Sequence, residues 1–85
     1  MKYRVFIEKK AIKQLENADA HTRRIIEEKI SKLKNGFPAY LDIKKLKGYR
    51  NYYRLRVGGY RILFELQPNY TIVVYAILPR RRAYK

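Results

Sequence analysis

Two stretches of alternating apolar and polar residues flank Gly58-Gly59 and predict a β-hairpin. The glycine pair suits a two-residue turn in which both positions have φ > 0. Such a turn pairs three positions across the strands: Val57 with Tyr60, Arg56 with Arg61, and Leu55 with Ile62. One face of the hairpin is then apolar and suited to a core, with Tyr53, Leu55, Val57, Tyr60, Ile62 and Phe64.

The other face of this hairpin carries three arginines, Arg54, Arg56 and Arg61, together with Leu63. Like charges directly opposite each other on neighbouring strands cost roughly 0.2–1 kcal/mol per pair. A charged face that only stays in water, or that prevents edge-to-edge aggregation, would be expected to mix both signs of charge. Three arginines without an acid favour a bound anion instead, because the guanidinium group matches phosphate oxygens.

Apolar spacing predicts a strand and two helices before the hairpin. Residues 3–7 alternate, and Phe6 on the outward face suggests that this face is also covered in part. A short helix is expected over 9–15, followed by a longer one over about 20–34 with Asp19 as its N-cap.

The remaining segments predict a connection, a strand and a basic ending. Residues 37–48 read as an irregular connection with interspersed lysines, and residues 70–78 read as a central strand buried on both sides. A basic and aromatic segment, residues 80–85, follows that strand. The element order β-α-α-β-β-β predicts an α+β fold, with the N-terminal strand and a helical hairpin packed on a twisted, mainly antiparallel sheet.

Length and composition exclude several classes of protein. The chain of 85 residues has room for one domain, 1–85, and has no run of 18 or more apolar residues that could span a membrane. It has no cysteine, which excludes disulfides and thiolate metal sites, and its first residues do not resemble a signal peptide. We therefore expect a cytoplasmic protein.

The charge of the chain points to polyanions. Lysine and arginine number 21 against 7 acidic residues, which gives a net charge of +14. Such a field attracts polyanions and adds sequence-independent affinity for phosphate backbones, although membrane surfaces and acidic proteins also remain possible partners. His21 is the single histidine and has no partners for a metal site, so we expect no cofactor.

Three features of the sequence resemble the RelE/ParE superfamily of toxins: Leu46-Lys47-Gly48, the segment from Tyr53 to Ile62, and Arg80 followed four residues later by Tyr84. The resemblance covers essentially the whole chain, and the Arg-x-x-x-Tyr ending points to RelE-like members. RelE-like proteins are toxins of type II toxin–antitoxin pairs. They enter the ribosomal A site, cleave mRNA there without a metal, and are silenced by a small acidic antitoxin. The resemblance implies this activity, the ribosome and mRNA as targets, and a RelB-like antitoxin as partner.

Cleavage of RNA through its own 2′-hydroxyl needs a base, positive charge at the phosphate, and an acid for the leaving oxygen. The resemblance places Arg61 and Arg80 at the scissile phosphate, with Arg80 also a candidate acid. It places Tyr84 where that side chain stacks on a base or assists proton transfer. Arg54 and Arg56 stand where well-studied members carry lysines, and a guanidinium with a pKa above about 12 cannot be the base. The base is therefore left open, with Tyr84 preferred.

Further basic residues are candidates for contacts with RNA or the ribosome: Lys44, Lys45, Lys47, Arg81 and Arg82. For the three lysines, a loop with solvated side chains is at least as good an interpretation. Two other functions stay open, a ParE-like toxin that binds gyrase without cutting RNA and a non-catalytic basic RNA-binding module. The basic ending with Tyr84 argues against the gyrase binder.

Overall fold

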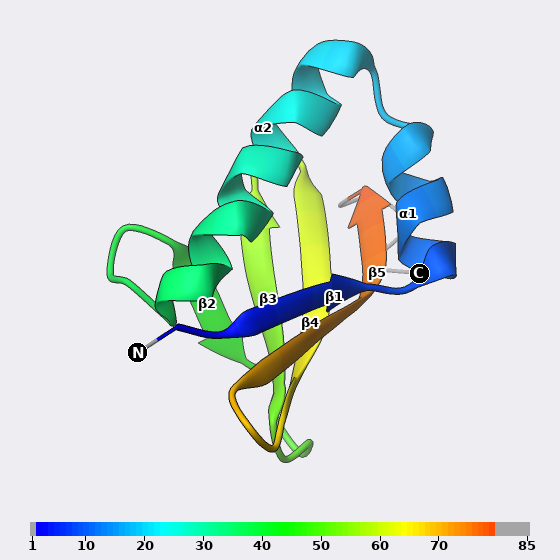
Figure 1. Cartoon of the computed structure of the whole chain (residues 1–85). Helices are drawn as coiled ribbons and strands as arrows, with labels where there is room; N and C mark the ends of the chain where they lie inside the picture. The colour runs from blue at the N-terminus through cyan, green and yellow to red at the C-terminus, as the bar shows by residue number, and fades with distance from the viewer. Residues whose placement is uncertain (1, 80–85) are drawn as a thin grey trace.

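A five-stranded sheet with two helices on one of its faces forms the part of the chain that the computed structural model describes, residues 2–79 (Figure 1). In chain order the elements are β1 (Arg4–Ile7), α1 (Lys9–Glu16), α2 (Ala20–Lys32), the short 3-10 helix η1 (Leu33–Asn35), β2 (Asp42–Lys45), β3 (Tyr52–Val57), β4 (Tyr60–Gln67) and β5 (Thr71–Pro79). The strand order is β1-β5-β4-β3-β2, and only the β1–β5 pair is parallel. The predicted α+β fold with a mainly antiparallel sheet is confirmed.

The central hairpin has the predicted register. Val57 pairs with Tyr60 and Arg56 with Arg61, so the turn is formed by the two glycines. Gly58 has a φ of 56°, whereas Gly59 does not have a positive φ, so the prediction for both turn positions was wrong. A positive φ at the first central position alone is enough to match the twist of the two strands, as type II′ turns show.

An additional strand, β2, replaces part of the irregular connection predicted over 37–48. It lies at the edge of the sheet and pairs antiparallel with β3, with Lys44 opposite Arg54. The prediction was wrong because four residues are too few to show a clear alternation, and β2 gains its hydrogen bonds from the adjacent strand rather than from its own pattern.

The helices begin and end close to the predicted positions. Asp19 caps α2, since its carboxylate accepts hydrogen bonds from the Thr22 backbone nitrogen at 3.1 Å and from the Thr22 hydroxyl at 2.6 Å. These two bonds, the side-chain bond first, lower the pKa of Asp19 below its usual value. After Lys32 the helix tightens into η1, and Gly36 then leaves it with a φ of 92°.

The hydrophobic core lies between the helices and one face of the sheet. It is formed by buried side chains of α1, α2 and η1 against β3, β4 and β5: Ala11, Leu15, Ile26, Ile30, Leu33, Leu55, Val57, Ile62, Phe64, Ile72, Val74 and Ile77. The short β1 pairs only with the first half of β5. Beyond it, the Gln14 side chain of α1 accepts a 2.7 Å hydrogen bond from the Ile77 backbone nitrogen, so a side chain satisfies this part of β5 where β1 no longer pairs with it.

The opposite face of the sheet carries no helix among the described residues (Figure 1). Phe6 points to this face and is 53% exposed, so the expectation that it is covered was wrong. Burial alternates along β5 up to Ala76, with Val73 and Tyr75 only half-buried, so the prediction of a strand buried on both sides was also wrong. Both errors have one cause, because α1 and α2 pack on the same face. We call the uncovered side the outer face.

Candidate functional site

A cluster of basic residues lies where β2, β3 and β4 run side by side, mostly on the outer face, while Lys45 pairs with Tyr53 of the core face at the sheet edge. They line a pocket of about 430 Å³, which we call the cationic pocket, formed by Lys44, Lys45, Leu46, Lys47, Arg54, Arg56 and Arg61. The strand register explains the cluster, because Arg56 lies opposite Arg61 on one side and Arg54 lies opposite Lys44 on the other. The structure thus brings together all six predicted basic residues within the part of the chain that it describes.

Arg54 differs from the other cations because it is buried. Only 7% of the residue is exposed, and its Nη2 lies 3.5 Å from a carboxylate oxygen of Asp42. The Asp42 side chain is 56% exposed, so water screens this ion pair and the attraction between the two charges is weak. The described residues that line the pocket are basic apart from Leu46, and this positive lining favours an anion at the pocket.

Three tyrosines and Leu46 line a second pocket of about 250 Å³ on the outer face, which we call the tyrosine pocket. Tyr52 packs edge-on against both of the others, with ring centroids 6.1 Å from Tyr49 and 5.6 Å from Tyr75. Sequence reasoning missed this cluster because it considered Tyr84 as the tyrosine of the site and placed Tyr75 in a strand buried on both sides. The available signal was the position of Tyr52 on the same strand face as Arg54, two residues away.

Tyr75 is a hydrogen-bond donor rather than a base. Burial raises the pKa of its hydroxyl, and the neighbouring Tyr52 and Glu65 raise it further. The hydroxyl is therefore protonated at neutral pH, and no proton acceptor for catalysis is offered at this position.

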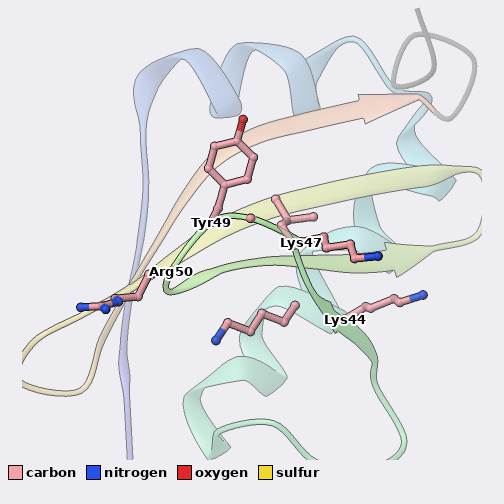
Figure 2. Close-up of a pocket in the computed structure, with 7 residues that line it drawn as sticks. Lys44, Lys47, Tyr49 and Arg50 are labelled. Atoms are coloured by element: carbon pink, nitrogen blue, oxygen red, sulfur yellow. The ribbon is translucent and has the colours of Figure 1, made fainter.

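The segment from Leu46 to Tyr49 joins the two pockets and is held by backbone hydrogen bonds. Leu46 donates to the Tyr52 carbonyl at 2.8 Å, and Tyr49 donates to the Leu46 carbonyl at 3.4 Å. A third hollow, of about 620 Å³, is lined by residues 44–50. Figure 2 shows Lys47 between Tyr49 and Lys44, while Arg50 points away from them.

The other predicted site residues, Arg80, Arg81, Arg82 and Tyr84, lie outside the described residues. Strand β5 ends beside β4, with Leu78 opposite Arg61. Within residues 2–79 no group of His, Asp or Glu side chains could hold a metal ion. No helix in this range is long and apolar enough to cross a membrane.

Comparison with known proteins defines the family. The family described as "ParE toxin of type II toxin-antitoxin system, parDE" matches residues 5–84. The curated toxin RelE3 of Methanocaldococcus jannaschii is 39% identical over 84 residues, which cover 95% of this chain and 94% of that toxin. The chain belongs to the RelE/ParE superfamily of type II toxins. The relatives place it among the RelE-like members, as the resemblance predicted.

Solved structures agree with this membership. The toxin of the RelB–RelE antitoxin–toxin complex from Methanococcus jannaschii superimposes with a TM-score of 0.81 at 38% identity, over 93% of this chain and 94% of that one. The archaeal RelE–RelB complex from Pyrococcus horikoshii OT3 gives a TM-score of 0.81 at 29% identity, over 96% and 99%. The fold of this toxin is therefore the RelE fold.

Proposed function

We propose that this toxin is an endoribonuclease that acts in the cytoplasm and cleaves mRNA at codons in the ribosomal A site. One observation carries the proposal. Six cations line one pocket at the β2, β3 and β4 side of the sheet, and Asp42 forms an ion pair with one of them, Arg54. Such a pocket suits a phosphodiester, because several arginines can each donate forked hydrogen bonds to its oxygens.

The proposed reaction uses positive charge rather than a metal. The 2′-oxygen attacks the adjacent phosphorus, the bond to the leaving 5′-oxygen breaks, and a proton passes to that oxygen. Arg56 and Arg61, which lie opposite each other, would stabilise the extra charge on the phosphorane-like transition state. Arg54 would hold the phosphate but cannot take a proton. Arg80 as acid and Tyr84 as base or stacking residue complete the proposal.

We also propose a small acidic RelB-like antitoxin as the partner of this toxin. The solved relatives from Methanococcus jannaschii and Pyrococcus horikoshii are complexes of RelE with RelB. A net charge of +14 and a basic pocket without a covering helix give an acidic chain a surface to neutralise. Co-expression with the adjacent small acidic reading frame should restore growth, and failure of every neighbouring frame to do so would contradict this partner.

The test is primer extension on a translated mRNA, with and without ribosomes. The wild-type toxin should give cuts at A-site codons that require ribosomes, and Arg61→Ala should reduce them by about 10²–10³-fold, as expected when a transition-state donor is lost. Arg24→Ala is the matched control, because Arg24 is exposed on α2, away from the pocket. Full cleavage by the Arg61 variant would contradict the proposed role of this residue.

A gyrase-binding toxin is the second candidate, because the matching family description names ParE. It predicts inhibition of DNA gyrase with intact mRNA in the same reactions. A third outcome, tight RNA binding without cuts or gyrase inhibition, would leave the basic RNA-binding module.

A further inference from the structure

We propose that the tyrosine pocket is a binding site for one nucleobase of single-stranded RNA, whose adjoining phosphate lies in the cationic pocket. The proposal deepens the proposed function, since the RNA is taken to be the substrate of the toxin. It concerns residues of the sheet and of the loop between β2 and β3, and it does not involve the basic segment after β5.

Adjacency of the two pockets is the first argument. Leu46 lines both of them, and Lys47 lies two residues before Tyr49 in the loop that joins them. The base and the phosphate of one nucleotide are joined by a single sugar, so a nucleotide needs an aromatic site and a cationic site side by side. Proteins that bind single strands use this combination of stacking platforms and basic grooves.

Tyr49 also supports the proposal, because its ring is exposed and its backbone is held in place. Its residue is 65% exposed, and one side of the ring packs edge-on against Tyr52. The loop that carries it is fixed at both ends, by the bond from Leu46 to the Tyr52 carbonyl and by the 2.8 Å bond from Leu66 to the Asn51 carbonyl. An exposed ring on a fixed loop is available to stack on a base at little cost in conformational entropy.

The charges around the two pockets give the bound nucleotide a direction. Glu65 lies opposite Tyr52 on β4 and close enough to Tyr75 to affect its titration, at the end of the tyrosine pocket away from the arginines. Its carboxylate would repel a phosphate there, whereas Arg54 and Lys47 attract one at the other end. The neutral base therefore belongs with the tyrosines and the phosphate with the cations.

The experiment uses the full chain and a short single-stranded oligoribonucleotide that contains one 2-aminopurine, without ribosomes. Stacking on an aromatic ring quenches the fluorescence of 2-aminopurine, so the wild-type toxin should quench it. Tyr49→Ala should lose the quenching and bind about 5- to 100-fold more weakly, whereas Tyr49→Phe should retain both. Tyr40→Ala is the matched control, because Tyr40 is 62% exposed and lies outside both pockets.

A second measurement keeps the test independent of how the variants fold. The wild-type toxin should bind an oligonucleotide with one abasic site at the labelled position as weakly as Tyr49→Ala binds the complete one. Equal affinity of the wild-type toxin for abasic and complete strands would overturn the base site, and so would unchanged quenching by Tyr49→Ala. If Tyr49→Ala weakened binding of an antitoxin but not of RNA, the pocket would be a protein contact and the proposal would be wrong.

Failure of this proposal is distinguishable from failure of the nuclease. Cuts at A-site codons without any quenching would overturn the base site and leave the nuclease in place. Quenching that depends on Tyr49, without cuts in any translated mRNA, would support the base site and contradict the nuclease.

Discussion

At the scale of single residues, Arg54 shows how one side chain can be buried and still line an open pocket. Its backbone lies between β2 and β4, and its guanidinium reaches an exposed carboxylate of Asp42 rather than a buried partner. A buried arginine usually requires a strong partner, because desolvation of a cation is costly. The single wet ion pair here leaves donors of the guanidinium for an anion in the cationic pocket.

Arg54→Met tests this interpretation, since it keeps a long apolar stem and removes the charge. We expect the free energy of unfolding to stay within about 1 kcal/mol of the wild type, because Asp42 is exposed and is not left as a buried charge. RNA affinity should fall, and the slope of log affinity against log salt concentration should shrink by about 0.7–1. Denaturant unfolding and titrations with an oligonucleotide measure the two effects.

Arg24→Met on α2 is the control for Arg54→Met, because it removes the same charge outside the pocket. A loss of several kcal/mol of stability in the Arg54 variant would show that Arg54 is a structural residue instead.

Prediction from sequence succeeded for residues whose position on a strand face is determined by nearby residues in the chain. The basic face of the hairpin followed from alternation alone, since Arg54 and Arg56 are two apart and Arg61 is fixed by the turn. The burial of Arg54 did not follow, because it depends on the edge strand β2 that the sequence pattern did not reveal. The tyrosine pocket was missed for a similar reason, since Tyr49, Tyr52 and Tyr75 meet only through the sheet.

At the scale of elements, the two glycines of the β3–β4 turn have different requirements although they are identical in sequence. Gly58 has a left-handed φ of 56°, whereas the φ of Gly59 lies outside the left-handed region. A Cβ atom added at either position would meet no atom within 4 Å, so the backbone conformation alone should separate them.

Gly58→Ala and Gly59→Ala form a matched pair of variants. Gly58→Ala should destabilise the toxin by about 1–2 kcal/mol, because alanine disfavours the left-handed conformation. Gly59→Ala should be neutral or stabilise it by up to about 1 kcal/mol, because alanine restricts the unfolded chain. Thermal or denaturant unfolding measures both changes, and equal destabilisation by the two variants would contradict this assignment of the turn.

At the scale of the whole molecule, the toxin separates its apolar and cationic surfaces onto opposite faces of one sheet. The helices cover one face (Figure 1), and the side chains of Arg54, Arg56 and Arg61 lie on the other at the cationic pocket. The element order and the hairpin predicted most of this fold because their signals are local. The error at Phe6 and along β5 arose because which face the helices cover is decided by packing between distant segments.

Salt should therefore act on the free toxin and on its RNA complex in opposite directions. Raising the salt concentration screens repulsion within a chain of net charge +14, so the melting temperature of the free toxin should rise. The same change should weaken RNA binding steeply, because each counterion released from the RNA gains less entropy when the salt concentration in solution is higher. Calorimetric melts and oligonucleotide titrations over one salt series check both signs, and a melting temperature that falls with salt would contradict the expected repulsion.

The parallel pairing of β1 with β5 has a consequence for how the toxin folds while it is being synthesised. Arg4 pairs with Thr71 and Ile7 with Val74. The first strand to be synthesised therefore cannot form its hydrogen bonds until β5, the last described strand, has been made. Contacts between such distant segments form late, because closing the long intervening chain is entropically unfavourable. Strand β5 also supports β4, which carries Arg61 opposite Leu78. The basic face of β4 therefore lacks the support of its neighbouring strand until residues 71–79 have been synthesised and have paired with it.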